Sequence, residues 1–266
     1  MILIPGCLAV LGLGALAVWL AAVPEVALEA RVPGLDKPSD LRARETSAEP
    51  VELKGRLTVG EGTPSRIDGS WSRFRGDRFD NIYDEPTPLA DHWDGLPPKM
   101  WSIEVGEGFA SPVVRAGRVY MIDYDRDAKE DVVRCLSLDD GRDIWQFRYA
   151  DEVKRNHGMS RTIPAVTDTF LVTIGPKCHV ACLHPETGEA YWLIDLVQQY
   201  GTVVPPWYAG QCPLIDGDRV ILAPGGPDVL MTALDAKTGE TVWETPNPHG
   251  WKMTHSSIMP MTIGGR

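Results

Sequence analysis

One eleven-residue unit occurs three times in the second half of this chain, and it constrains the fold more than any other feature. The copies read CLSLDDGRDIW (135–145), CLHPETGEAYW (182–192) and ALDAKTGETVW (233–243). In each copy a glycine stands six residues after a small residue, and a tryptophan follows four residues after the glycine. Successive copies are 47 and 51 residues apart, and periods of this length are typical of β-propeller blades.

Each period also divides into four short segments rich in β-branched and aromatic residues, separated by Gly, Asp and Pro turns. In the first period these segments predict strands at 110–114, 119–123, 132–138 and 144–149. The second period repeats the pattern from IPAVT to AYWLID, and the third from CPLI to TVWET. No helical periodicity competes with this pattern in these spans. The sequence therefore predicts an all-β propeller of four-stranded antiparallel blades.

The repeated glycines and tryptophans have structural roles in this interpretation. A single four-stranded blade leaves both faces unburied, so blades must stack on one another. Glycine in a hairpin turn permits a positive φ, and a tryptophan between blades buries a large area. The predicted structural set is Gly141, Trp145, Gly188, Trp192, Gly239 and Trp243.

The unit resembles the tryptophan-docking motif A-x-D-x-x-T-G-x-x-x-W of the quinoprotein, or pyrroloquinoline-quinone-like (PQQ-like), propeller family. Residues 233–243 match every fixed position, and WSRFRGDRFD (71–80) resembles the W-x-x-F-R-G opening found ahead of such propellers. The first two copies depart from the motif at Cys135, Ser137, Asp140, Cys182 and His184. The resemblance covers about residues 71–266. It implies the propeller fold but no single activity, because the family includes alcohol dehydrogenases, an outer-membrane assembly lipoprotein and proteins that bind no quinone.

Two segments indicate an incomplete ring. KMWSIEV (99–105) looks like an outer strand carrying Trp101, yet no first three strands precede it. SSIMPMTIGGR (256–266) looks like the first strand and turn of a fourth blade. Three blades plus fragments are fewer than the four to eight of a closed propeller. We expect a truncated product or gene fragment with an open edge at its last strand.

The N-terminus predicts a membrane attachment. Residues 2–23 contain no charge, and 22 apolar residues in a helix match the roughly 30 Å hydrocarbon core of a bilayer. We favour an uncleaved anchor at 1–23 over a cleaved signal peptide, because the basic start and the cleavage pattern of a signal are missing. Residues 24–67 are then an extended linker and 68–266 the propeller domain, placed in the periplasm or outside the cell.

Charge and motif content narrow the range of functions. The net charge of −11 disfavours nucleic acid and anionic lipid as partners. The five cysteines form no CxxC pair, and the six histidines show no metal-binding spacing. The acidic stretch 123–131 lacks the glycine and glutamate of a calcium-binding EF-hand loop, so we interpret it as a solvated hairpin loop. We expect no metal site and name no catalytic residue.

The loops that lead into each innermost strand are the best candidates for a binding site, since small ligands bind in concave surfaces. We call the segments 107–111, 156–161, 205–211 and 251–257 the mouth loops. Each carries an aromatic, His, Arg or Gln side chain shortly before its strand, and such side chains suit an acidic or planar ligand. The candidates are His157, Arg161, Trp207, Gln211 and His255, with Phe109 and Trp251 beside them. The alternative is that they pack against loop backbone.

Three functional hypotheses stay open. The first is a non-catalytic binding or scaffolding module for a protein or cell-envelope ligand, without a cofactor. The second is a fragment of a PQQ-dependent alcohol or sugar dehydrogenase, which would require PQQ, calcium and a set of calcium ligands. The third is a degenerate fragment without function.

Overall fold

The computed structural model describes most of the chain, in two compact units, 1–32 and 33–266. The described residues are 3–22, 53–67, 69–83, 90–154 and 159–262. The first unit contains one helix, α1 (Leu3–Ala21), which is 19 residues long and uncharged. Among the described residues, no helix has the length and apolarity that crossing a membrane requires. The predicted transmembrane role of this segment stays a prediction.

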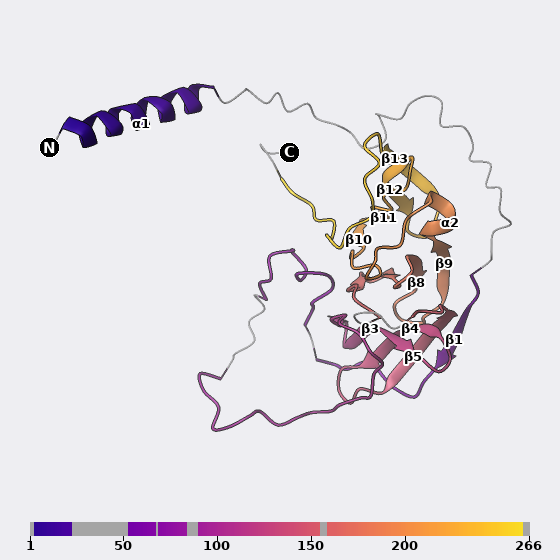
Figure 1. The fold of residues 1–266 in the computed structure, drawn as a ribbon. Helices are drawn as coiled ribbons and strands as arrows, with labels where there is room; N and C mark the ends of the chain where they lie inside the picture. Colours follow the sequence, from indigo (N-terminus) through magenta and orange to yellow (C-terminus); the bar gives the residue numbers. More distant parts are fainter. Residues whose placement is uncertain (1–2, 23–52, 68, 84–89, 155–158, 263–266) are drawn as a thin grey trace. The chain divides into compact units, whose positions relative to one another are not determined.

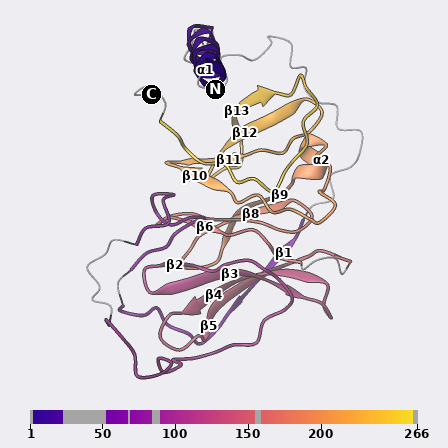
Figure 2. The same cartoon turned by 60° about the vertical axis from the view of Figure 1, so that its left-hand side comes forward.

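The second unit contains three antiparallel sheets that follow one another along the chain (Figures 1 and 2). We call them the first, second and third blades. The first blade consists of β2 (Val113–Arg115), β3 (Arg118–Asp125), β4 (Glu130–Ser137) and β5 (Asp143–Ala150), with one added strand. The second consists of β6 (Ala165–Val166), β7 (Leu171–Ile174), β8 (His179–Leu183) and β9 (Ala190–Asp195). The third consists of β10 (Leu214–Asp216), β11 (Arg219–Leu222), β12 (Val229–Asp235) and β13 (Thr241–Pro246).

Within each blade the strands pair in sequence order, so all twelve predicted strands are confirmed. The described residues thus form part of a propeller, because three blades are fewer than a closed ring requires. A register shift follows the residue opposite each repeat tryptophan, at Cys135, Cys182 and Ala233. The three blades therefore share the same register shift, and each tryptophan stands at the same point of its outer strand.

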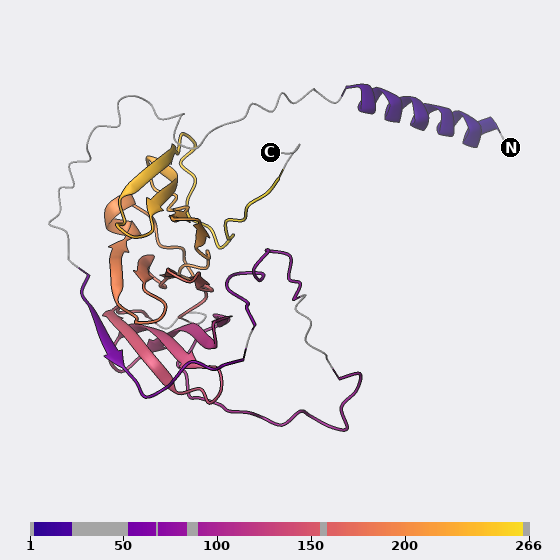
Figure 3. The ribbon, with the colours of Figure 1, turned by 180° about the vertical axis from the view of Figure 1, so that it is seen from behind.

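The added strand is β1 (Gly55–Val59), which lies within the segment predicted to be an extended linker. It pairs antiparallel with β5 and extends the first blade to five strands (Figure 3). The leucine in its centre, Leu57, packs into the core between the first and second blades and lies against Gly188. The predicted boundary at residue 67 is therefore wrong for this stretch, since the propeller sheet begins at residue 55. Residues 23–52 of the predicted linker lie outside the described residues.

Trp145 joins the first blade to the second. Its indole Nε1–H donates a hydrogen bond of 3.0 Å to the carbonyl oxygen of Pro185, three residues before Gly188. The ring lies so close to Gly188 that an added Cβ would stand 2.6 Å from Cδ2 of the indole. Gly188 also has a φ of +75°, which favours glycine. Docking of Trp145 therefore requires a glycine at position 188, both for the space that its missing side chain leaves and for its positive φ.

The same contact recurs at the next interface. Trp192 donates from Nε1 to the carbonyl oxygen of Ala236 at 2.9 Å, and its ring covers Gly239 with φ +74°. The acceptor again stands three residues before the glycine. Trp243 occupies the equivalent place in the third blade, opposite Ala233, and is buried. The predicted position of the tryptophans between blades is confirmed for Trp145 and Trp192.

Apolar side chains complete the two interfaces. Val133, Phe147 and other residues of the first blade meet Leu171 and Leu183 of the second. On its other face the second blade places Val172 and Val180 against Leu222 and other side chains of the third. Burial of this kind contributes about 25 cal/mol per Å² of apolar area, so the stacking of blades is the main stabilising term. Cys135, Cys178, Cys182 and Cys212 are buried and form no disulfide bond.

Two predicted strands do not form. The described stretch 99–105 has no regular structure, although Trp101 docks like the other tryptophans: its Nε1 donates to Leu138 O at 2.9 Å, and its ring covers Gly141. The stretch 256–262 is also irregular, and 263–266 lies outside the described residues. A strand requires backbone hydrogen bonds to a neighbouring strand, and neither segment is paired with a strand in the sheets of the described residues.

Replacing Gly188 with alanine tests the docking contact. Gly188→Ala combines a positive φ with a clash against the Trp145 ring, whereas Gly217→Ala has a similar φ of +58° and nothing within 4 Å of the new Cβ. We expect urea unfolding to show a loss of about 1–2 kcal/mol in the free energy of unfolding for Gly217→Ala. Gly188→Ala should lose about 1–3 kcal/mol more, because it also overpacks the interface. Equal losses would contradict the docking role.

Candidate binding surface at the mouth

The described parts of the mouth loops are tied to one another by backbone and side-chain contacts. Gly108 and Ser160 form a parallel bridge between the first two loops, and the Phe109 amide donates to Ser160 O at 2.7 Å. The third loop is tied to the segment ahead of the second, where the Tyr208 hydroxyl donates to Lys154 O at 2.6 Å. These loops therefore contact one another and form one continuous surface.

Three aromatic side chains stand out from this surface. Phe109 is 73% exposed, Trp207 52% and Trp251 60%. Burying large aromatic rings is strongly favourable, so rings left in water on neighbouring loops indicate a site for contact with another molecule. The guanidinium carbon of Arg161 lies 5.8 Å from the centre of the Phe109 ring, which places a cation beside an aromatic face.

Trp207 and His255 form the clearest pair. Their rings are stacked with centroids 6.5 Å apart and planes inclined by 16°. His255 Nε2 lies 2.9 Å from the carbonyl oxygen of Tyr208, which fixes the imidazole, and the ring also packs against Gly210. Because Tyr208 has a φ of +66°, the loop turns sharply after Trp207. The sequence candidates Trp207 and His255, which stand 48 positions apart, are thus brought together.

The other sequence candidates have different outcomes. Gln211 is 2% exposed, and its amide group bonds to both backbone groups of Ala223: Oε1 accepts at 2.9 Å and Nε2 donates at 3.4 Å. These contacts brace the third blade and leave little of Gln211 exposed to a ligand, while its ligand-binding role stays a prediction. His157 lies outside the described residues. Trp251 stacks on His249 at 5.1 Å, a contact that the sequence spacing did not reveal.

A buried ionic cluster, which the sequence did not reveal, lies where the first two blades meet. Tyr149 on β5 donates its hydroxyl to Oδ2 of Asp131 on β4 at 2.5 Å, and Asp131 is fully buried. Burial raises the pKa of Asp131 to about 7, although the bond from Tyr149 acts in the opposite direction. Gly175 of the second blade lies directly against both groups.

His179 of β8 completes the cluster between two carboxylates. Its Nδ1 lies 3.5 Å from Asp151 Oδ2 and its Nε2 lies 3.7 Å from Asp195 Oδ2, while Lys177 approaches Asp151 at 3.7 Å. Burial would lower the pKa of His179, but the two carboxylates outweigh it and raise the pKa to about 9. Among the described residues, no group of three or more His, Cys, Asp or Glu side chains is arranged for a metal ion. We interpret the cluster as a polar staple between blades.

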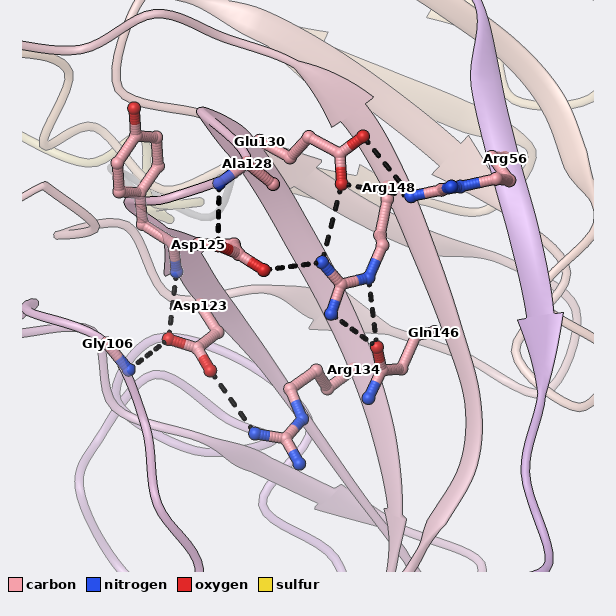
Figure 4. A network of polar contacts seen from close by, with 10 residues as sticks. Arg56, Gly106, Asp123, Asp125, Ala128, Glu130, Arg134, Gln146 and Arg148 are labelled. Carbon is pink, nitrogen blue, oxygen red and sulfur yellow. Dashed lines mark hydrogen bonds and ion pairs between the residues drawn. The ribbon is translucent and has the colours of Figure 1, made fainter.

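A second polar network covers the face of the first blade that points away from the second (Figure 4). Arg134 bonds to Asp143 through two nitrogens at 3.0 and 2.9 Å and to Asp123 at 3.2 Å. Arg148 reaches Asp125 at 3.0 Å. A pocket of about 240 Å³ lies between this network and the segment 104–106. The two guanidinium groups already have carboxylate partners, so the pocket offers no uncompensated charge to a ligand.

The prediction of a solvated hairpin loop at 123–131 is wrong for most of this acidic stretch: Asp123 and Asp125 lie in β3, Glu130 and Asp131 lie in β4, and Asp131 is fully buried. Only residues 126–129 form the turn between the two strands, where Asp125 Oδ1 accepts from the amide of Ala128 at 3.0 Å. Asp123 Oδ1 instead accepts from the amide of Gly106 at 2.6 Å. These carboxylates are thus used to order backbone.

The comparisons with known proteins agree with this architecture. A family model described as outer membrane protein assembly factor BamB, one of the PQQ-like repeat models, matches residues 128–265, which is more than half of the chain. The chain belongs to this PQQ-like repeat family. No curated protein sequence shows significant similarity to it.

Several solved structures are similar to this chain at low sequence identity. Quinohemoprotein alcohol dehydrogenase ADHIIG from Pseudomonas putida HK5 is 21% identical, with 68% of this chain and 29% of that chain covered and a TM-score of 0.44. The quinohemoprotein alcohol dehydrogenase from Comamonas testosteroni has the same identity and coverage and a TM-score of 0.45. BamB from Moraxella catarrhalis is 15% identical, with 59% and 45% covered and a TM-score of 0.42. The chain spans less than half the length of each.

The staple predicts a pH-dependent stability. A carboxyl group whose folded pKa is raised stabilises the fold below its unfolded pKa of about 4, and this contribution is lost as the pH rises through about 7. Asp131→Asn has no such group, so its stability relative to the native chain should improve between pH 4 and pH 7, by up to about 4 kcal/mol. Urea unfolding at several pH values measures the difference.

Asp94→Asn, at an exposed carboxylate, is the control for that series. His179 affects stability in a different pH range. Because its pKa is raised, its stabilising contribution is complete below about pH 6.5 and is lost as the pH rises through about 9. This fall in the free energy of unfolding at high pH should also occur in Asp131→Asn. A native chain whose stability runs parallel to that of Asp131→Asn from pH 4 to pH 7 contradicts the buried state of Asp131.

Proposed function

We propose that this chain is a non-catalytic binding module of the PQQ-like repeat family, held at a membrane by its N-terminus and exposed outside the cytoplasm. The binding surface is the set of mouth loops, and the ligand is a protein or cell-envelope molecule that offers acidic or aromatic groups. The observation that carries the proposal is the row of exposed rings, Phe109, Trp207 and Trp251, supplied by three different loops.

The chemistry of the surface supports a protein-like ligand. Aromatic side chains and arginine are enriched where proteins bind one another, and a few such anchors supply most of the binding energy. Here Arg161 stands beside Phe109, and His255 stacks on Trp207. Within the four mouth loops the charged side chains are Arg161, Lys252 and Glu107, a formal charge of +1, whereas the whole chain carries −11. An acidic segment with aromatic side chains would match both features.

The alternative is a fragment of a quinone-dependent dehydrogenase, which the family and the names of the similar structures bring into consideration. Such an enzyme holds its quinone with a calcium ion. The described residues do not fit that requirement, since none of their acidic, His and Cys side chains cluster for a metal ion. We therefore derive no reaction step through a quinone. Quinone absorbance after reconstitution with PQQ and calcium would favour this alternative.

The membrane attachment rests on the sequence. Residues 2–23 carry no charge, and α1 forms within them. Between α1 and β1 lie 33 residues, enough to span at most about 110 Å when fully extended. A module on such a tether can meet ligands well away from the bilayer surface.

Site-specific photo-crosslinking tests the binding surface. A photoreactive phenylalanine analogue at position 207 or 251 of the full chain should give a discrete adduct in cells that express it, because these rings contact the ligand. The same analogue at position 93 replaces a tryptophan that is equally exposed but outside the mouth loops. Arg161→Ala should weaken the adduct at 207 severalfold, because a cation that contacts the ligand is removed. Equal adducts at 93 and 207 would sink the proposal.

Removing residues 1–23 tests the attachment. We expect the full chain to stay in the membrane pellet after alkaline carbonate washing, since a buried apolar helix is held by the bilayer and not by charge. The truncated chain should move to the supernatant with its far-UV circular dichroism spectrum of β structure unchanged. A full chain released by carbonate rules out an integral anchor.

A further inference from the structure

The segment 71–75 crosses the inner strands of the blades in order. Trp71 forms an antiparallel bridge with Val114 of β2, with hydrogen bonds of 2.9 and 3.0 Å in the two directions. The next residue, Ser72, accepts at its carbonyl oxygen from the amide of Val166 on β6 at 2.9 Å. Consecutive residues of one short segment therefore hold the first blade and the second blade.

The next side chains continue the series. Arg73 donates from Nη1 to the carbonyl oxygen of Ile215 on β10 at 3.4 Å, which brings in the third blade. Arg75 donates from Nη1 to the sulfur of Met259 at 3.7 Å. Met259 belongs to the segment 256–262, which follows the third blade and forms no strand.

The four contacted residues are equivalent positions of the repeat. Each is the last residue of a four-residue stretch that leads into a turn, and the stretches read SPVV, IPAV, CPLI and SSIM. Val114, Val166, Ile215 and Met259 end these stretches. The segment thus contacts the same position of the repeat four times. Its last contact holds 256–259 where the inner strand of a fourth blade would lie. The Ser257 hydroxyl, which accepts from the amide of Cys212 at 3.1 Å, keeps that stretch beside the third blade.

The segment itself is rigidly folded. Gly76 has a φ of +79°, and its Cα faces the Trp71 ring, where an added Cβ would stand 3.2 Å away. Asp77 accepts from the Ser72 amide at 2.8 Å, and Arg73 lies over the Phe79 ring at 5.3 Å. The W-x-x-F-R-G pattern therefore has a physical basis: the glycine permits the turn over the tryptophan, and the arginines point to the blades.

We propose that residues 71–75 form an axial bracket and that Arg73 and Arg75 are positioning residues for the mouth surface. Arg73 holds the strand entered from the loop that carries Trp207, and Arg75 holds the stretch entered from the loop that carries His255. The stacked pair therefore depends on two strands fixed at their far ends by neighbouring arginines. This inference extends the proposed function, but its test requires no ligand, so it can fail or succeed independently.

Two measurements on the full chain test the bracket. Hydrogen exchange detected by mass spectrometry reports on the Cys212 amide, whose acceptor is Ser257. Acrylamide quenching of Trp207, taken as the difference between each variant and the same variant with Trp207→Phe, reports on the stack with His255. Arg75→Ala should speed exchange at Cys212 by roughly three- to tenfold, the factor for losing one hydrogen bond. It should also raise the quenching of Trp207 above that of the native chain. Exchange at the Val114 and Val166 amides should stay slow.

The controls separate positioning from general stability. Arg78→Ala removes an exposed arginine that lies three residues beyond this segment and pairs with Asp80, and it should leave both readouts unchanged. Arg75→Lys keeps a donor for the Met259 sulfur and should restore most of the protection at Cys212. Unchanged exchange and quenching in Arg75→Ala overturn the proposal, and so does a rise spread equally over β2, β6 and β10, because that pattern means global destabilisation.

Discussion

The structure depends on an indole ring lying on the glycine of the next blade while its N–H bonds to a carbonyl three residues before that glycine. Trp101, Trp145 and Trp192 all make this contact, with hydrogen bonds of 2.9–3.0 Å. The contact combines apolar burial, which has no direction, with a hydrogen bond, which does. Burial drives the sheets together. The hydrogen bond, and the close approach that a glycine without Cβ permits, fix how the sheets are aligned. A repeat that keeps only a glycine and a tryptophan thereby specifies a stack of sheets.

Stacking alone does not place the mouth loops, because one blade could still tilt against the next. Two further sets of contacts restrict this tilt. The staple of Asp131, Tyr149, Asp151 and His179 ties the first blade to the second. At the inner strands, the segment 71–75 contacts each blade in turn. Trp207 and His255 are then brought together on loops whose strands are held at the other end, so the exposed rings form one surface on a defined scaffold.

The sequence predicted what repetition reveals. All twelve blade strands and the positions of Trp145 and Trp192 were predicted, since three copies of one pattern define their common structure. Features outside the repeat were harder. β1 lies in a stretch whose composition suggests a linker, and only the free edge of β5 makes it a strand. The stretch 99–105 has a strand's composition but no partner strand. The staple joins residues from different strands, and no local sequence pattern shows that they are partners. The burial of Gln211 was also not predicted, because it depends on two hydrogen bonds to the backbone of Ala223.

Protection of the tryptophan indole protons tests the central claim most directly. In a protein labelled with ¹⁵N-tryptophan, each indole N–H gives its own resonance, and its exchange with D₂O can be followed by NMR. The account predicts slow exchange for Trp145 and Trp192, whose N–H groups are buried and bonded across blade interfaces, and fast exchange for Trp251, which is 60% exposed. If the indoles of Trp145 and Trp192 exchange as fast as that of Trp251, the blades are not docked through these residues and the architecture described here is wrong.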